Sequence, residues 1–463
     1  MRKSWWRALV FDKLGVTMNL TRRAFTAAAL SLPVAFSATR RPNIVVIVAD
    51  DLGFADLGFQ GSREIHTPHL DRLAAAGVRF DNGYVTHPFC SPTRAGMLTG
   101  RYQQRFGHEN NMVFDPKDEV AGLPLTEKPL PELLSEAGYV TGIVGKWHLG
   151  AHPKFHPMKR GFREMYGFVG GGHDYFDPGH AGAADQHFIP NERNGEAAVE
   201  KEYLTTALGR EAEAFIRRHP KDPFFLYLAF NAPHAPLQAP PEMVAKYAGI
   251  KDPARRTYAA MVTAMDDSIG RTLNALKELK LEEDTLVFFL SDNGGPTGNA
   301  STNTPLRGTK RTLYEGGVRV PFVMRWPAQL GKPRVDSRPV VSLDVFATAL
   351  AAAGVKPPTG LTLDGVDLLP YLTGKQRADP HPRLYWRTFG GAEAAIREGQ
   401  WKWVRSVNSA PELYDLSRDP SERNNLIQER PADAARLKNA WEEWNRQMRS
   451  PRWPDHIFDR KRG

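Results

Sequence analysis

The sequence predicts an α/β protein with a large, mostly parallel central sheet that helices cover on both faces. Strand-like apolar runs recur along the chain, and the first of them is typical of a strand buried on both faces. Segments with helical features lie between these runs, and an alternation of this kind is typical of parallel sheets. The expected strands are residues 44–48, 140–144, 224–230 and 285–290.

Three helices can be placed by their ends or their spacing. Thr67 and Pro68 suit the N-cap and first position of a helix that Gly77 ends. A second helix is expected over Pro131–Ala137 for the same reasons. Residues 256–280 have the spacing of a long amphipathic helix, so helices separate the predicted strands.

The amino-acid composition changes near residues 373–382, where charged residues and prolines are frequent. Beyond this segment we expect short antiparallel strands at 394–404 and 413–416 and a terminal helix at 431–448. The sequence therefore predicts a large domain over residues 41–375 and a small C-terminal α+β subdomain over residues 384–463 with a short antiparallel sheet.

Residues 1–37 have the features of a twin-arginine signal peptide. Arg22 and Arg23 precede an apolar stretch of roughly a dozen residues, which is shorter than a bilayer span, and small residues suit cleavage after position 37. We expect the twin-arginine export machinery as a partner, no stable membrane anchor, and a periplasmic or secreted protein. An amphipathic or disordered tail is the alternative, and Met18 is a second candidate start.

The composition excludes or disfavours several classes of protein. One cysteine in 463 residues excludes an intrachain disulfide and a cysteine zinc cluster. The formal net charge is +9, but residues 1–37 carry +5 of it, which leaves +4 for the rest. Because no long basic run with interleaved aromatic residues remains, we expect no nucleic-acid partner.

Polar side chains follow each of the four expected strands. They are Asp50 and Asp51 after the first strand, Lys146 and His148 after the second, His234 after the third, and Asp292 and Asn293 after the fourth. Ligands of open α/β sheets bind at the carboxyl ends of the strands, so we expect one shared site. Each group taken alone is more often a turn, a helix cap or a surface loop; their shared topology carries the prediction.

The acidic and amide residues of this set predict a metal site. Asp50, Asp51, Asp292 and Asn293 offer oxygen ligands without a histidine among them. Such ligands suit a hard cation, calcium first and magnesium second. Three carboxylates crowded together would repel one another without a cation.

The single cysteine lies in a short motif. Residues 90–94 read Cys-Ser-Pro-Thr-Arg, and residues 98–101 read Leu-Thr-Gly-Arg. A lone cysteine is usually a small buried hydrophobe, but these polar neighbours are unusual in a core. The stretch resembles the signature of the type I, formylglycine-dependent sulfatases, which include the arylsulfatases and belong to the alkaline-phosphatase-like superfamily. The resemblance extends from about Arg41 to the C-terminal helix.

The resemblance implies a fold and an activity. The fold is an alkaline-phosphatase-like sandwich. A formylglycine-generating enzyme would convert Cys90 to formylglycine, and its hydrate would hydrolyse sulfate monoesters through a covalent sulfo-enzyme intermediate, with a calcium ion. The expected substrates are sulfated carbohydrates, such as fragments of a sulfated polysaccharide, and aryl sulfates.

The resemblance also assigns roles to residues. The catalytic residues would be Cys90, Arg94, Lys146, His148, His234 and Lys310, and the metal ligands Asp50, Asp51, Cys90, Asp292 and Asn293. Arg94, Lys146 and Lys310 would hold the sulfate oxygens. Asp292 would take the proton of the attacking hydroxyl, His234 with Lys310 would protonate the leaving oxygen, and His148 would assist release of sulfate.

Polar loop residues are candidates for binding the rest of the substrate. They are Asn111, His173, Asp174 and Arg387. Such groups suit sugar hydroxyls, but hydrogen bonds that stabilise loops are an equal alternative.

Two other functions compete with the sulfatase prediction. Phosphodiester and phosphonate monoester hydrolases of the same superfamily also carry formylglycine, although they tend to have Asp-His where this chain has Asp292 and Asn293. A non-catalytic glycan-binding relative is the second alternative, and the complete set of charged residues argues against it.

Overall fold

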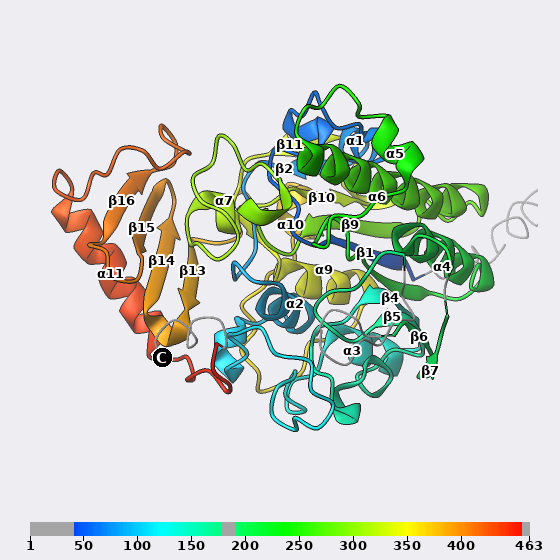
Figure 1. The fold of residues 1–463 in the computed structure, drawn as a ribbon. Coiled ribbons are helices and arrows are strands. Elements are labelled where there is room, and N and C mark those ends of the chain that lie inside the picture. The colour runs from blue at the N-terminus through cyan, green and yellow to red at the C-terminus, as the bar shows by residue number, and fades with distance from the viewer. Residues whose placement is uncertain (1–40, 177–189, 200, 456–463) are drawn as a thin grey trace, which may run out of the picture. The chain divides into compact units, whose positions relative to one another are not determined.

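The computed structural model describes residues 41–176, 190–199 and 201–455, so the predicted signal peptide at residues 1–37 lies outside the described residues. In this part of the chain the main sheet has ten strands (Figure 1). Their spatial order is β11 (Arg334–Asp336), β2 (Val78–Phe80), β10 (Phe322–Arg325), β9 (Thr285–Ser291), β1 (Asn43–Ala49), β8 (Phe224–Ala229), β4 (Val140–Lys146), β5 (Glu164–Phe168), β6 (Glu192–Arg193) and β7 (Glu196–Ala197).

The centre of the sheet is parallel. Strand β1 pairs in parallel with β8 and β9, and Val46 lies opposite Tyr227 on one side and Phe288 on the other. Strands β4 and β5 continue this direction, whereas β10 and β6 are antiparallel to their neighbours. The prediction of a mostly parallel central sheet is therefore confirmed.

Strand β1 supplies apolar side chains to both faces of the sheet. Val45 and Ile47 belong to one buried cluster, and Val46 and Val48 belong to the other. This alternation is the two-residue period of a strand, and it explains why the run at 44–48 is apolar throughout. Each such side chain stabilises the fold by about 1.5–3 kcal/mol when fully buried.

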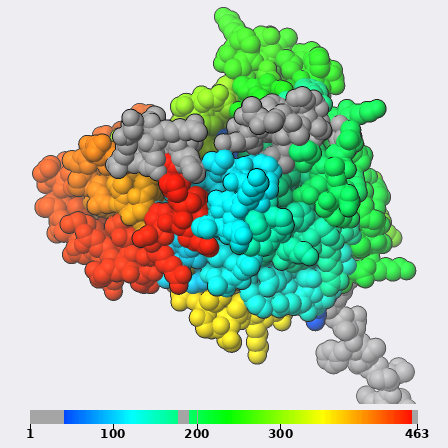
Figure 2. Space-filling view, turned by 60° about the horizontal axis from the view of Figure 1, so that its bottom comes forward, coloured from blue at the N-terminus to red at the C-terminus, as the bar shows by residue number. Residues whose placement is uncertain are grey.

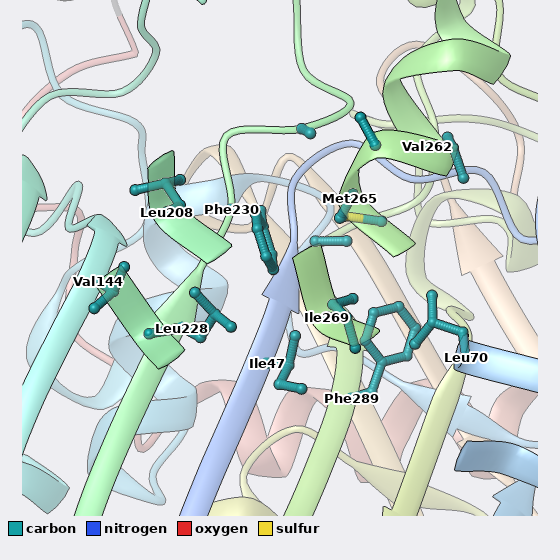
Figure 3. Close-up of a cluster of buried hydrophobic side chains, with 14 of the residues drawn as sticks. Ile47, Leu70, Val144, Leu208, Leu228, Phe230, Val262, Met265, Ile269 and Phe289 are labelled. Carbon is teal, nitrogen blue, oxygen red and sulfur yellow. The ribbon is translucent and has the colours of Figure 1, made fainter. Parts of the chain in front are cut away.

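Helices cover both faces. The first face carries α1 (Pro68–Ala75), α4 (Leu204–Arg218) and α6 (Pro253–Glu278), and the second carries α2 (Cys90–Thr99), α3 (Leu130–Glu136) and α9 (Asp344–Ala353). Figure 3 shows Ile47 and Phe289 of the sheet lying against Ile269 of α6.

The start of α1 differs from the prediction. Thr67 occupies the N-cap position, but its hydroxyl makes no capping bond and donates to the Asp71 carboxylate instead. The carboxylate of Asp266, from α6, accepts from the backbone N–H groups of His69 and Leu70 at 3.0 and 2.7 Å. The helix also ends at Ala75 rather than at a glycine cap. A residue nearly 200 positions away therefore satisfies the amides that a local cap would otherwise bind.

A second, four-stranded antiparallel sheet follows near the C-terminus (Figure 1). It consists of β13 (Arg383–Thr388), β14 (Glu393–Glu398), β15 (Trp401–Arg405) and β16 (Glu412–Asp415), with α11 (Pro431–Asn445) packed on it. The segment predicted as a strand at 394–404 is a hairpin, because Gly399 reverses the chain with φ 56°.

The apolar core continues between the two sheets. Trp386, Trp403 and Trp441 of the C-terminal sheet and its helix share one buried cluster with Tyr84 and Leu343. Figure 2 shows the C-terminal segment (red) beside the segment near residues 100–120 (cyan), where Trp453 Nε1 donates to the Asn110 carbonyl. The domain boundaries at 375 and 384 stay a prediction.

The smaller elements connect these layers. They are β3 (Gly83–Tyr84), β12 (Val340–Val341), α5 (Pro241–Ala245), α7 (Glu315–Val318), α8 (Pro327–Leu330) and α10 (Leu369–Leu372), with 3-10 turns at 58–60, 103–106, 153–155, 157–159, 297–299 and 389–391. Among the described residues, no helix combines the length and the apolar character that crossing a membrane requires.

Candidate active site

Four adjacent strands bring the predicted site residues together. Strands β9, β1, β8 and β4 are neighbours in the sheet, and their carboxyl ends lie at one edge. Asp50 and Asp51 follow β1, Lys146 is the last residue of β4, and Asp292 and Asn293 follow β9. The topology thus places charges that are far apart in the sequence within contact of one another.

Cys90 is the first residue of α2 and points into this group of charges. Its Sγ lies 3.6 Å from Asp50 Oδ1 and 3.2 Å from Lys310 Nζ. The side chain is 1% exposed, and burial raises the pKa of the Cys90 thiol to about 12 despite the two nearby lysines. The thiol is therefore neutral and a weak nucleophile in its unmodified form.

Two buried cations lie beside Cys90. Arg94 follows one helical turn later on the same face of α2, and its Nε and Nη2 donate to Asp292 Oδ2 at 2.9 and 2.7 Å. Lys146 Nζ lies 2.5 Å from Asp50 Oδ2. None of these four side chains is exposed, so each charge needs its partner.

Asp51 is the centre of a second set of contacts. Lys310 Nζ lies 2.6 Å from its Oδ1, Asn293 Nδ2 donates to the same oxygen at 2.7 Å, and His234 Nε2 lies 3.5 Å from Oδ2. Burial alone would raise the pKa of Asp51, but Lys310 and His234 outweigh it and hold the pKa at about 2. Asp51 is therefore ionised at neutral pH.

Asp292 has the opposite shift. Burial and the nearby carboxylate of Asp50 raise the pKa of Asp292, although Arg94 opposes them. Two neighbouring carboxylates with different proton affinities suit one that stays charged and one that accepts a proton.

The same residues fit a hard metal ion. Ligand atoms of Asp50, Asp51, Cys90 and Asp292 lie within 4.8 Å of one another. Asn293 Oδ1 is buried and has no hydrogen-bond partner among the described residues. A buried, unsatisfied amide oxygen is costly, and it is the type of ligand that calcium and magnesium take. The donor set is rich in oxygen, as the sequence predicts.

His148 is held by its backbone. Its φ is 55°, and its carbonyl accepts a hydrogen bond of 2.7 Å from Ser91 Oγ, next to Cys90. Burial and the nearby cations lower its pKa, so the ring is neutral. A Cβ at position 171 would lie 2.7 Å from His148 Nε2, which explains a glycine there.

His234 lies at the more exposed edge of the site. Its side chain is 15% exposed, and its Nδ1 lies 2.7 Å from the Ala235 carbonyl. Tyr175 Oη donates to the backbone carbonyl of His234 at 2.8 Å. Burial lowers the pKa of His234 to about 3. Ring contacts at Nδ1 with Ala235 and at Nε2 with Asp51 orient the imidazole.

Three of the four predicted substrate-binding residues make local contacts. Asn111 Oδ1 accepts from Ser91 N at 3.1 Å, at the start of α2. His173 Nδ1 lies 2.7 Å from the Asp174 carbonyl, and the Asp174 carboxylate accepts from Phe176 N at 2.8 Å. Asn111 thus lies next to the residue that follows Cys90. The loop with His173 and Asp174 reaches the end of β8, where Asn231 Nδ2 donates to the His173 carbonyl at 3.0 Å.

Arg387 lies on β13 of the C-terminal sheet and is buried. It is 3% exposed, forms a 2.5 Å ion pair with Glu109, and donates to Asn445 Oδ1 at 2.9 Å. These contacts join β13 to the segment at Glu109 and to α11. That Arg387 binds substrate stays a prediction.

The prediction from sequence missed Asn299. Its Nδ2 donates to the carbonyls of Asp51 and Pro233 at 3.0 and 3.3 Å and so links the loops after β1 and β8. No local signal marks this residue, because it lies in a loop rich in small polar residues.

Comparisons with known proteins agree with this geometry. A sulfatase family model matches residues 42–355, which is more than half of the chain. The chain belongs to the sulfatase family. A second model, described as N-sulphoglucosamine sulphohydrolase, C-terminal, matches residues 308–448. This sulfatase is therefore a sulfuric ester hydrolase, as the sequence predicts.

Individual relatives cover most of this sulfatase. It is 39% identical over 401 residues to dog N-acetylgalactosamine-6-sulfatase, with 80% of this chain and 74% of the relative covered. It is 34% identical over 458 residues to human arylsulfatase A, with 89% and 87% covered.

Solved structures place the sulfatase in its superfamily. Ps i-CgsB in complex with k-i-k-neocarrahexaose superposes with a TM-score of 0.86 at 38% identity, covering 91% of this chain and 96% of the other. The phosphonate monoester hydrolase of Agrobacterium radiobacter superposes with a TM-score of 0.62 at 21% identity, covering 88% of this chain and 95% of the other. At this identity the likeness shows a common fold and nothing about function. The predicted alkaline-phosphatase-like fold is confirmed.

Proposed function

We propose that this sulfatase removes sulfate from sulfated carbohydrates, and accepts small aryl sulfates, after conversion of Cys90 to formylglycine. The observation that carries the proposal is the place of Cys90. It begins α2, is buried, and lies 3.2 Å from the Lys310 ammonium and 3.6 Å from the Asp50 carboxylate. A buried thiol with a raised pKa is poorly suited to attack sulfur by itself, which favours a modified side chain.

The modified residue would supply the nucleophile. As an aldehyde hydrate it offers one hydroxyl that attacks sulfur and a second that expels sulfate, so hydrolysis proceeds through a covalent sulfo-enzyme in two easier steps. Position 90 is suited to this because the first turn of α2 directs backbone N–H dipoles toward an anion.

Three cations would hold the sulfate oxygens. Arg94, Lys146 and Lys310 approach the same small volume from α2, β4 and the loop before α7. Each is paired with a carboxylate, so the cations are fixed before substrate arrives. Preorganised charge of this kind stabilises the charge that spreads over the sulfate oxygens in the transition state.

The oxygen-rich donor set would hold a calcium ion, with magnesium as the second choice. Asp50, Asp51, Asp292, Asn293 and residue 90 are the proposed ligands. A bound divalent cation would neutralise negative charge on the sulfate group.

Four side chains would take part in proton transfer. The raised pKa of Asp292 suits acceptance of the proton from the attacking hydroxyl. His234 and Lys310 both contact Asp51 at the exposed edge and would together protonate the leaving oxygen; Lys310 carries the proton, because the lowered pKa of His234 leaves its ring neutral. His148 is neutral and fixed by Ser91, which suits a base that assists release of sulfate.

The substrate class is supported by the names of similar proteins. N-acetylgalactosamine-6-sulfatase is named for a sulfated amino sugar, and Ps i-CgsB was solved with k-i-k-neocarrahexaose.

We further propose that a formylglycine-generating enzyme matures the chain before twin-arginine export to the periplasm or beyond. We keep a catalytic domain over 41–375 and a subdomain over 384–463 as part of the proposal. Asn111, His173, Asp174 and Arg387 remain proposed substrate contacts.

The test is a rate comparison on defined esters. The wild type, produced with the modifying enzyme, is assayed on sulfated mono- and oligosaccharides, an aryl sulfate and an aryl phosphodiester, beside Cys90→Ala. We expect hydrolysis of sulfate esters by the wild type and loss of that activity in the variant. A higher kcat/KM on the phosphodiester would favour the phosphonate or phosphodiester hydrolase instead. Full activity of Cys90→Ala would overturn the mechanism.

A further inference from the structure

Arg311 is an exposed cation immediately beside the proposed site. It follows Lys310, whose Nζ reaches Cys90 Sγ. Within the ranges that the structure describes, the guanidinium of Arg311 has no carboxylate partner, whereas Arg94, Lys146 and Lys310 each have one. Arg311 therefore adds a positive charge that the carboxylates of the site do not neutralise.

The backbone at Arg311 is fixed in an unusual conformation. Its φ is 79°, in the left-handed region that non-glycine residues rarely adopt. Arg311 N donates to the Pro88 carbonyl at 3.1 Å, and Lys310 N donates to the Gly295 carbonyl at 3.2 Å. Such a conformation persists only where its surroundings impose it, and it is frequent at functional sites.

The side chain lies over an aromatic ring at the N-cap of α2, the helix that Cys90 begins. The Arg311 guanidinium carbon lies 5.9 Å from the centroid of the Phe89 ring, and Phe89 is the residue before Cys90. A cation over a ring face is oriented without using its N–H groups. The five donors of the guanidinium remain available to a planar or tetrahedral anion such as a carboxylate or sulfate.

The exposed edge of the site is the edge next to Arg311. The side chains of Arg94 and Lys146 are 0% exposed, whereas those of Lys310 and His234 are 10% and 15% exposed. A substrate whose reacting sulfate lies at residue 90 must therefore extend past Lys310 and His234. Arg311 follows Lys310 in the chain and is exposed, so we place it along this path.

We infer that Arg311 binds a second anionic group, a sulfate or a carboxylate, on the substrate whose reacting sulfate lies at residue 90. The inference rests on the proposed function and narrows its substrate class to sugars with at least two anionic groups. Its role is substrate recognition, because an exposed cation attracts a second anion in the ground state as well as in the transition state.

The test compares two esters of one sugar in two variants. A hexose monosulfate and the corresponding hexose disulfate are assayed with wild type, Arg311→Ala and the control Arg423→Ala. A sulfated uronate is assayed as well, to test whether a carboxylate can serve as the second anionic group. Arg423 follows β16 and is exposed, and its side chain makes no hydrogen bond or ion pair within the described residues. Melting temperatures show whether each variant is folded.

We expect Arg311→Ala to lower kcat/KM about tenfold or more on the substrates with two anionic groups, mainly through KM, and less than threefold on the monosulfate. The preference should also weaken with added salt in the wild type but not in this variant. An equal loss on all substrates, or none, overturns the inference and leaves the proposed function standing. Absence of sulfatase activity in the modified wild type would instead overturn both.

Discussion

The ammonium group of Lys310 lies 3.2 Å from Cys90 Sγ and thereby ties the loop before α7 to the start of α2. Although burial opposes its charged form, Asp51 raises the pKa of Lys310, so the side chain is protonated throughout the usual pH range. Its charge is fixed where the reacting group must lie.

We predict that Lys310→Met reduces kcat on an aryl sulfate by roughly 10²–10³-fold, as removal of an oriented donor does in other sites. Lys332→Met is the control, because Lys332 is exposed in a turn. Initial rates at saturating substrate give the answer. A loss of less than tenfold would mean that Lys310 does not contact the reacting group.

Asn293 offers a direct test of the metal site that is independent of turnover. Its Oδ1 is buried without a partner among the described residues, and a bound cation would satisfy it. We expect calcium to raise the melting temperature of the wild type and to raise that of Asn293→Ala less. A tenfold weaker affinity removes about 1.4 kcal/mol of calcium-linked stability at saturating calcium.

The control for the calcium experiment is Asn274→Ala, an exposed position on α6. This variant should respond to calcium as the wild type does. An equal response of Asn293→Ala and the wild type would exclude Asn293 as a ligand.

A buried lysine with two carboxylate partners joins the C-terminal sheet to α7. Lys402 of β15 lies 2.8 Å from Glu315 of α7 and 3.0 Å from Glu422, and none of the three side chains is exposed. We expect Lys402→Ala to lower the free energy of unfolding by about 3–5 kcal/mol, because the buried Glu422 carboxylate would lose its cation and Glu315 would keep only the Arg319 guanidinium at 3.5 Å. Urea unfolding of the wild type and the variant measures this difference in free energy.

The matched control for Lys402 is Lys438→Ala. Lys438 pairs with Glu442 at 3.5 Å on the exposed face of α11, where such a pair contributes about 0.5 kcal/mol or less. Similar losses of unfolding free energy in both variants would show that the buried contacts of Lys402 stabilise the fold no more than an exposed ion pair does.

His381 predicts a pH dependence of stability. Burial opposes its protonated form, but the carboxylate of Asp344, 2.8 Å away, prevails and raises the pKa of His381. A raised pKa in the folded state means that the pair stabilises the fold fully below the unfolded pKa of about 6.5, and that this stabilisation is lost as the pH rises through the folded value.

The expected outcome is a difference between wild type and His381→Gln that is larger at about pH 5.5 than at a pH well above the folded pKa. Urea midpoints at both pH values give the difference. A difference that grows with pH would mean that His381 is neutral in the folded protein.

Much of the site could be predicted because it depends on local signals and one topological rule. Asp50, Lys146 and Asp292 follow apolar runs that are recognisable strands, and the carboxyl ends of parallel strands meet at one edge. Cys90 and Arg94 lie one helical turn apart, so their spacing places them on one face.

The rest depends on contacts between distant segments, which a local pattern does not record. Asp266 caps α1 from another helix, and Asn299 links the loops after β1 and β8. Arg387 looks like a sugar ligand in the sequence, but its partner Glu109 lies 278 positions away. The local sequence around a polar residue therefore does not reveal whether its partner is a ligand or a distant part of the chain.

The central claim is that Cys90 acts after conversion to an aldehyde. The most direct measurement is intact mass and aryl sulfatase rate on the same preparations, made with different amounts of the modifying enzyme. We predict that activity rises in proportion to the fraction of chains in which the thiol CH2–SH has been replaced by the aldehyde CHO. Full activity in a preparation whose Cys90 is entirely a thiol would contradict the account.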